Sequence, residues 1–245
     1  MTYQDKLFDG QQVLVVGGTS GIGAGIAAAF LATGARVLLT GATPADLELA
    51  ASDASLQGAG TAQLDVRDDA AVVRQVEACG QLHVLVNCAG MIRRGEELKP
   101  EVFASVLDVN LNGTMRACAA ARAMLAETQG SIINIASMLS FFGGGLVPAY
   151  SASKGGVAQL TKSLAIAWAD DGIRVNALAP GWIATRFTSA LQEVAARSEA
   201  ILARTPLKGW GTPQDVAGAA LFLASPAAAF VTGVVLPVDG GYLIS

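Results

Sequence analysis

Short apolar runs alternate with longer, alanine-rich stretches along the 245 residues of this chain. The runs have the length of buried β-strands, and the stretches between most of them suit α-helices, for example 21–33, 100–128 and 150–169. Such an alternation is typical of a parallel sheet covered by helices on both faces. The runs are QVLVVG (12–17), RVLLTG (36–41), AQLDV (62–66), HVLVNCAG (83–90), SIINIAS (131–137), RVNALAPG (174–181) and VVLPVDG (234–240).

The pattern predicts a single α/β domain over residues 1–245, with a doubly wound, Rossmann-like parallel sheet of about seven strands. The composition agrees, because 52% of the residues are hydrophobic and only 15% are charged, enough to bury a large core. The formal net charge of -4 argues against a nucleic acid or a membrane surface as partner. We therefore expect a small-molecule partner.

The cysteines and the histidine argue against a metal site. Cys79, Cys88 and Cys118 are odd in number and widely spaced, and His83 is the only histidine. We expect no metal and no disulfide framework, which suits a reducing compartment. The start, MTYQDKLFDGQQ, is polar and lacks the apolar core of a signal peptide, so we predict a cytoplasmic protein.

The segment from Val216 to Val238 carries no charge and has the length of a membrane span. Ser225-Pro226 and Thr232-Gly233 interrupt it with turn signals. We interpret it as a buried helix, a turn and a strand, and its low charge also suits burial between subunits.

A glycine-rich loop, G17-G-T-S-G21-I-G23, follows the first strand-length run and opens the first helical stretch. Glycines at such a junction let the backbone approach a phosphate, and a helix N-terminus offers free N–H groups to it. The spacing is GxxxGxG rather than GxGxxG, and tight packing of strand on helix is the alternative.

Turn and polar residues gather at the carboxyl ends of the predicted strands, where doubly wound sheets bind ligands. These residues are Gly17, Gly41, Asp65, Asn87 with Gly90, Ser137, and Pro180 with Gly181.

Tyr150 stands four residues before Lys154 in AYSASKGG, so a helix places both on one face. A free phenol has a pKa of about 10, and a nearby ammonium favours the phenolate. The pair is thus able to act as an acid/base near neutral pH. The alternative is two solvated residues on a helix face.

Together these motifs resemble the short-chain dehydrogenase/reductase family over the whole chain. The similarity rests on GGTSGIG (17–23), LDV (64–66), NCAG (87–90), Asn110 in VNLNG, Ser137 in INIAS, YSASK (150–154) and PGWIAT (180–185). Val16 and Cys88 depart from the residues usual in the family. The family fold agrees with the predicted sheet.

The resemblance implies an NAD(P)-dependent oxidoreductase acting on CH–OH groups. Tyr150 would be the general acid/base and Lys154 would lower its pKa and bind the nicotinamide ribose. Ser137 would hydrogen-bond the substrate oxygen, and Asn110 would hold a water that connects Lys154 to solvent. The alternatives are a helix cap for Ser137 and a partner of a buried backbone group for Asn110.

The resemblance also implies the cofactor contacts. Tyr150 and Lys154 would also contact the cofactor. The glycine loop would surround the pyrophosphate, Asp65 and Val66 would hold the adenine, and the segment after Pro180 would hold the carboxamide. Asp65 is alternatively a helix N-cap. The residues concerned are Gly17, Thr19, Ser20, Gly21, Ile22, Gly23, Gly41, Asp65, Val66, Asn87, Ala89, Gly90, Pro180, Gly181, Ile183 and Thr185.

The choice between NAD and NADP depends on the residues after the second strand, T40-G-A-T43. They offer neither the acidic residue typical of NAD binding nor an arginine for a 2′-phosphate. Thr40 and Thr43 are possible partners of that phosphate. The resemblance of MIRR (91–94) and INIASMLSFFGG (133–144) to the sugar-acid branch of this family implies NAD, which we favour.

Finer similarity points to the sugar-acid branch of the family, which includes gluconate 5-dehydrogenase and 2-deoxygluconate 3-dehydrogenase. It rests on MIRR (91–94), INIASMLSFFGG (133–144) and RTPLKGWGTPQDV (204–216). Arg93 or Arg94 would bind the substrate carboxylate, beside Ser137 and Met138. A solvated pair bonded to Glu96 or Glu97 is the alternative.

Two other functions share these motifs. One is a 3-oxoacyl carrier-protein reductase, for which Arg186, Arg197, Arg204 and Lys208 would form a basic docking surface. The other is a dinucleotide-binding sensor without catalysis, against which the intact Ser137, Tyr150 and Lys154 argue. The resemblance further implies a homotetramer.

Overall fold

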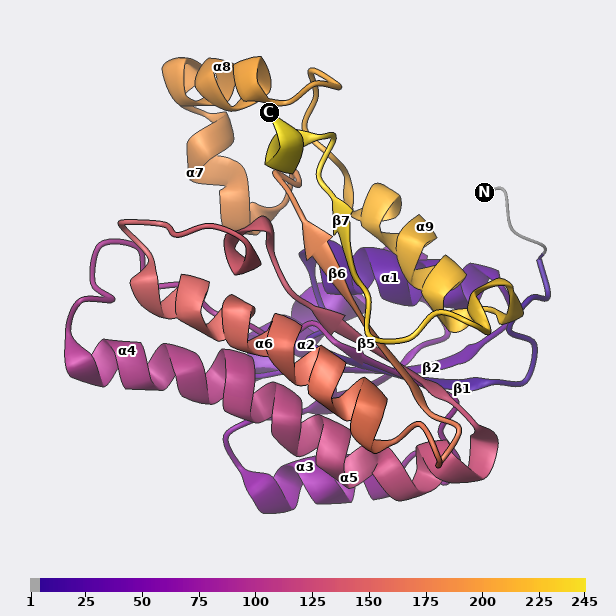
Figure 1. The fold of residues 1–245 in the computed structure, drawn as a ribbon. Helices are drawn as coiled ribbons and strands as arrows, with labels where there is room; N and C mark the ends of the chain where they lie inside the picture. The colour runs from indigo at the N-terminus through magenta and orange to yellow at the C-terminus, as the bar shows by residue number, and fades with distance from the viewer. Residues whose placement is uncertain (1–4) are drawn as a thin grey trace.

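The computed structural model describes residues 5–245, and its centre is one parallel sheet of seven strands in the order β3-β2-β1-β4-β5-β6-β7 (Figure 1). This order confirms the predicted doubly wound sheet. The strands are β1 (Gln12–Val16), β2 (Arg36–Gly41), β3 (Gly60–Gln63), β4 (Val84–Asn87), β5 (Ser131–Ile135), β6 (Arg174–Pro180) and β7 (Val235–Val238).

Helices cover both faces of the sheet. Along β1, Val13 and Val15 pack on the side of α1 (Gly21–Ala32) and α9 (Pro213–Ala224), whereas Leu14 and Val16 pack on the side of α3 (Asp69–Glu77), α5 (Gly113–Thr128) and α6 (Pro148–Ala167). This alternation follows from the two-residue period of a strand. The helices are α1 (Gly21–Ala32), α2 (Pro44–Ala51), α3 (Asp69–Glu77), α4 (Pro100–Leu107), α5 (Gly113–Thr128), α6 (Pro148–Ala167), α7 (Ser189–Gln192), α8 (Ala195–Arg204) and α9 (Pro213–Ala224).

The predicted helix over 100–128 is two helices. A π-helical turn, Asp108–Asn112, separates α4 from α5 and contains Asn110. Such turns widen a helix locally and are frequent at functional sites. Apolar periodicity does not reveal this turn, because α5 continues in nearly the same direction as α4 (Figure 1).

The predicted third strand, 62–66, lies too far along the chain, since β3 covers Gly60–Gln63. It is an edge strand paired only with β2, and its residues are mostly exposed, so an apolar run does not mark it. Asp65 and Val66 therefore follow the strand rather than ending it.

The uncharged segment from Val216 to Val238 is a helix, a turn and a strand, as predicted. It contains most of α9, a short 3-10 turn at Pro226–Ala228, and β7. Among residues 5–245, no helix is both long and apolar enough to cross a membrane. The first four residues of the polar start lie outside the described residues.

Candidate active site

Tyr150 and Lys154 lie on consecutive turns of α6, which begins at Pro148. Pro148 suits the first helical position, because a proline lacks the N–H that would be unpaired there. Lys154 is only 4% exposed, and its Nζ donates a 2.6 Å hydrogen bond to the carbonyl of Ile135, where β5 ends. The same Nζ lies 5.6 Å from the centroid of the Tyr150 ring, so the predicted pair is formed.

The predicted lowering of the Tyr150 pKa is not what the structure gives. Burial raises the pKa of Tyr150 to about 12, against a smaller lowering by a hydrogen bond from Ser137. Burial also lowers the pKa of Lys154 to about 8. The ammonium lies over the ring and bonds to Ile135, so it does not offset the desolvation of the phenolate.

Ser137 caps a helix, which was the alternative to a hydrogen bond with the substrate oxygen. Its Oγ accepts a 3.1 Å hydrogen bond from Leu139 N and caps the 3-10 helix Met138–Ser140. Its side chain also hydrogen-bonds Tyr150. Met138 beside it is 5% exposed.

Asn110 is fully buried in the π-helical turn and satisfies backbone groups, which was the alternative to a catalytic water site. Its Oδ1 accepts from Met91 N at 2.8 Å, and its Nδ2 donates to Met91 O at 3.0 Å. Nδ2 also donates to Ser153 Oγ at 3.0 Å, and Ser153 Oγ donates to Tyr150 O at 2.7 Å. Asn110 thus connects the segment after β4 to the turn that carries Tyr150.

The glycine loop lies where the first strand meets α1, as expected. Gly17 has a φ of +80°, and a methyl group there would lie 2.5 Å from Ala89 N. Gly21 lies beside Thr185, since its methyl would lie 3.4 Å from Thr185 Cγ2. Ser20, the N-cap of α1, makes no side-chain cap hydrogen bond, so the N–H groups of the first turn keep no side-chain partner.

These features fit a dinucleotide. The first turn of α1 has N–H groups without side-chain partners, and the loop before it has no room for a side chain at Gly17, so a phosphate can approach the backbone. Gly90 lies beside Asn110 and Lys154, since a methyl there would lie 3.4 Å from Asn110 Oδ1 and 3.7 Å from Lys154 Nζ. Asn87 adds a buried Oδ1 without a hydrogen-bond partner among the described residues. The other predicted cofactor residues stay predictions.

Asp65 is not a helix N-cap, because Asp68 caps α3. Its carboxylate instead pairs with Arg67 at 2.6 Å and accepts from Arg67 N at 3.0 Å. The Arg67 guanidinium holds the pKa of Asp65 below its ordinary value. Val66 packs closely on Gly113, where a methyl would lie 2.6 Å from Val66 Cγ2.

Arg93 and Arg94 are exposed, and within residues 5–245 neither guanidinium forms a salt bridge. The alternative of a side-chain bond to Glu96 or Glu97 is therefore not seen. The loop is held by its backbone, because Gly95 N donates to Leu146 O at 2.8 Å. Both arginines thus stand free on a loop fixed against the segment that leads into α6.

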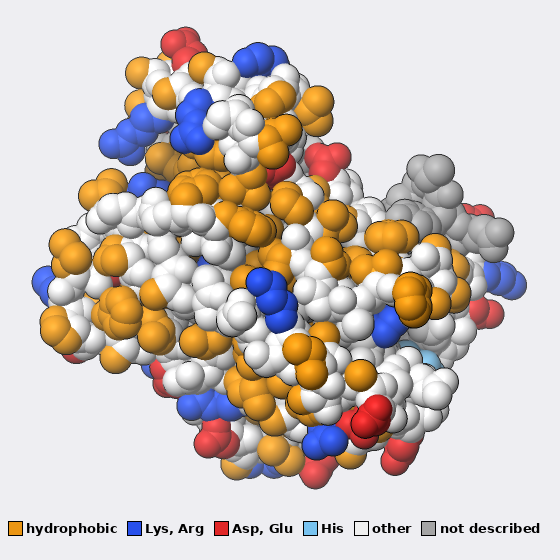
Figure 2. Space-filling model, viewed as in Figure 1, with side chains coloured by type: hydrophobic (Ala, Val, Ile, Leu, Met, Phe, Trp, Pro, Cys, Tyr) orange, Lys and Arg blue, Asp and Glu red, His pale blue; other side chains and the backbone are white. Residues whose placement is uncertain are grey.

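Exposed apolar side chains lie on the segments that follow β5 and β6. Phe141, Phe142 and Leu146 are exposed on the segment after β5, and Phe187 is exposed just before α7. The rings of Phe187 and Tyr150 lie 6.4 Å apart between centroids. Figure 2 shows hydrophobic side chains gathered where the projecting α7 and α8 meet the body of the molecule.

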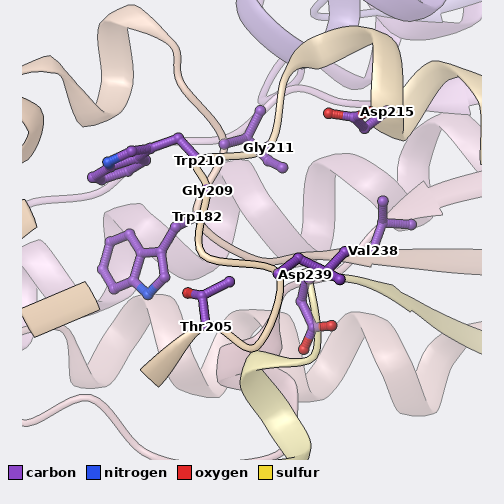
Figure 3. Close-up of a pocket in the computed structure, with 11 residues that line it drawn as sticks. Trp182, Thr205, Gly209, Trp210, Gly211, Asp215, Val238 and Asp239 are labelled. Carbon is purple, nitrogen blue, oxygen red and sulfur yellow. The ribbon is translucent and has the colours of Figure 1, made fainter. Parts of the chain in front are cut away.

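A cavity of about 270 Å³ lies between the segments that follow β6 and β7 and the segment before α9, and no sequence motif predicted it. Figure 3 shows Trp182 and Trp210 on one side of it and Asp239 on the other. The two indoles meet edge to face at 6.0 Å, and Trp182 Nε1 has no hydrogen-bond partner among the described residues. None of the four predicted catalytic residues lines it.

Cation-binding clusters are not part of this site. Within residues 5–245, no group of three or more His, Cys, Asp or Glu side chains is placed to hold a metal ion.

A family model described as enoyl-(acyl carrier protein) reductase, adh_short_C2, matches residues 16–243. The chain belongs to the short-chain dehydrogenase/reductase family and is an NAD(P)-dependent oxidoreductase of CH–OH groups.

Relatives and solved structures agree with this family. The chain is 43% identical to 2-dehydro-3-deoxy-D-gluconate 5-dehydrogenase of Bacillus subtilis, covering 96% of this chain and 95% of that protein. It is 42% identical to galactitol 2-dehydrogenase (L-tagatose-forming) of Cereibacter sphaeroides, covering 96% of both. A structure from Agrobacterium tumefaciens, provisionally named 2-deoxy-D-gluconate 3-dehydrogenase, holds NADP and matches with a TM-score of 0.88 and 40% identity over 99% of this chain and 100% of that one.

Proposed function

We propose that the enzyme transfers hydride between a nicotinamide and a secondary alcohol or ketone of a sugar acid. The observation that carries this proposal is that Arg93 and Arg94, on the loop held against the start of α6, form no salt bridge with any described residue. An arginine binds a carboxylate through two parallel hydrogen bonds. Relatives named for gluconate-type substrates support the same substrate class.

In this proposal Tyr150 exchanges the proton with the substrate oxygen, and Ser137 hydrogen-bonds that oxygen. The nicotinamide, when bound, supplies or accepts the hydride. Lys154 keeps a positive charge beside the phenol and is fixed by Ile135. Asn110 and Ser153 hold the backbone of the Tyr150 turn against the segment after β4.

Removal of one free guanidinium is expected to weaken sugar-acid binding selectively. Loss of a charged hydrogen-bond partner costs about 1.5–3 kcal/mol, so Arg93→Ala or Arg94→Ala should raise the KM for a sugar acid about tenfold to hundredfold. A neutral polyol such as galactitol should keep its KM, because it has no carboxylate. Steady-state kinetics on both substrates check this, and equal weakening of both substrates by both variants would contradict it.

We further propose a preference for NAD over NADP. Thr40 is buried and its Oγ1 accepts from Gly17 N, while Thr43 caps α2 with Asp46, so neither threonine is free for a 2′-phosphate. Asp46 also packs on Gly41. Residues 40–56 contain acidic side chains and no basic one, which repels a second phosphate.

The matching experiment compares the KM values for NADH and NADPH in the wild type and in Asp46→Asn. We expect the wild type to favour NADH and the variant to bind NADPH more tightly, because one negative charge is gone while an amide still accepts at the cap. A wild-type KM for NADPH far below that for NADH would overturn the preference.

A 3-oxoacyl carrier-protein reductase is less well supported, and the family description names a different carrier-protein enzyme, an enoyl reductase. Two of its four predicted docking cations are occupied. Arg204 lies 4.3 Å over the Tyr242 ring and donates to its hydroxyl, and Lys208 Nζ donates to Ala203 O at 2.8 Å.

We also propose a cytoplasmic homotetramer. The three described cysteines are free, which suits a reducing compartment. Leu98, Ile166 and Phe230 are among the exposed large apolar side chains that an interface would cover. Light scattering of the purified protein tests the tetramer, and a monomer at micromolar concentration would contradict it.

A further inference from the structure

Glu97 is the only buried carboxylate among residues 5–245, with 1% of its surface exposed. No salt bridge pairs it with a lysine or an arginine within these residues. Its oxygens instead accept two backbone hydrogen bonds of 2.8 Å, Oε1 from Arg93 N and Oε2 from Tyr150 N. A buried carboxylate is tolerated only when such donors replace water.

The α6 helix needs this carboxylate. Its own N-cap residue, Val147, has no side-chain acceptor, and Pro148 at the first position has no N–H. Tyr150 is the third helical residue, the position whose N–H a capping side chain normally satisfies. Glu97, on a separate loop 53 residues earlier in the chain, accepts the hydrogen bond from this N–H in place of a capping side chain. Its negative charge also lies at the positive end of the helix dipole.

The other half of the contact reaches the arginine loop. Arg93 N is bound by the same carboxylate that binds Tyr150 N, and Gly95 N donates to Leu146 O next to it. One carboxylate therefore fixes the backbone of the proposed acid/base and the backbone of the proposed carboxylate-binding loop relative to each other.

We propose that Glu97 is a positioning residue that sets the distance between the proton-transfer group and the substrate-binding arginines. This inference rests on the proposed roles of Tyr150 and of Arg93 or Arg94. Glu97 acts through backbone atoms and does not touch the substrate. When an arginine binds the carboxylate of a sugar acid, the distance from that arginine to the Tyr150 hydroxyl therefore determines which carbon of the substrate reaches Tyr150.

The test compares Glu97→Gln and Glu97→Ala with Glu96→Gln, an exposed neighbour of the same chemistry. The Gln variant keeps one acceptor oxygen and so one of the two hydrogen bonds, whereas Ala keeps none. We expect kcat to fall about tenfold to hundredfold in Glu97→Ala, less in Glu97→Gln, and not at all in Glu96→Gln. Thermal melting of each variant gives the folded fraction by which the rates are corrected.

The substrate dependence separates positioning from a merely structural role. For a neutral polyol, Glu97→Gln should lower kcat with KM unchanged. For a sugar acid it should also raise KM, and this rise should disappear in a double variant that already lacks the arginine responsible, because the two changes act on one contact. Loss of folded protein alone would lower both rates equally and leave both KM values unchanged.

The inference is overturned if Glu97→Gln and Glu97→Ala keep wild-type kcat and KM per folded enzyme, or if their KM effect adds fully to that of the arginine variant. Wild-type enzyme assayed in parallel distinguishes failure of the proposed function. If the wild type turns over the polyol but no sugar acid, the substrate proposal fails, and the kcat order of the Glu97 variants on the polyol still decides the role toward Tyr150.

Discussion

Tyr150→Phe is expected to lower kcat about 100-fold to 10,000-fold while the dinucleotide still binds with near wild-type affinity. The phenol oxygen is the proposed proton-transfer group, and positioned acid/base groups contribute rate factors of that size. Phenylalanine keeps the ring that packs near Phe187 and Lys154, so the site keeps its shape. Steady-state rates and calorimetric titration with NADH measure the two quantities.

The pH profile supplies the control for this prediction. Oxidation needs the phenolate, and burial raises the Tyr150 pKa to about 12. The phenolate fraction, and with it the oxidation rate, should therefore increase with pH in the wild type up to about 8, where Lys154 begins to lose its positive charge. The residual rate of Tyr150→Phe should lack this increase. A Phe variant that keeps most of its rate would remove Tyr150 from the mechanism.

Gly17→Ala is expected to weaken dinucleotide binding about tenfold to hundredfold, which is the loss of one hydrogen bond to a charged group. Two causes combine at this position. The φ of +80° disfavours any side chain, and the added methyl would lie 2.5 Å from Ala89 N and 2.6 Å from Ala89 Cα. The glycine loop must then move away from the segment after β4, and its N–H groups lose their alignment with a phosphate.

Gly58→Ala is the matched control, because Gly58 has a φ of +92° but no atom within 4 Å of the added methyl. This variant should lose about 1–2 kcal/mol in the free energy of unfolding from backbone strain alone. Its affinity for the dinucleotide should stay at the wild-type value. Equal affinities in the Gly17 and Gly58 variants would show that crowding at the glycine loop has no part in cofactor binding.

The sequence predicted the sheet well, because buried parallel strands are continuous apolar runs that alternate with helices. The proximity of Tyr150 and Lys154 was also predictable from the sequence, since the two residues are one helical turn apart on α6. The pKa values of Tyr150 and Lys154 were not predictable in the same way, because the desolvation of the two side chains depends on how β5 and the loop after β4 pack around them.

Glu97 and the Trp182 cavity show what local sequence patterns miss. From its charged neighbours in the sequence, Glu97 would be expected on an exposed loop. Only the fold brings it to the N-terminus of α6. Trp182 and Trp210 are 28 positions apart and meet because β6 and the segment before α9 end side by side. Contacts between distant segments of this kind carry no short-range periodicity.

The central claim is oxidation or reduction of a sugar acid, and a substrate panel with the wild-type enzyme tests it most directly. Nicotinamide absorbance would be followed with a gluconate-type sugar acid, the neutral polyol galactitol and a 3-oxoacyl thioester, each with both cofactors. We predict the highest kcat/KM for the sugar acid with NAD(H). A higher value for the polyol would contradict the role of the arginines, and a higher value for the thioester would favour a carrier-protein reductase. No turnover of any of the three would contradict the proposed function itself.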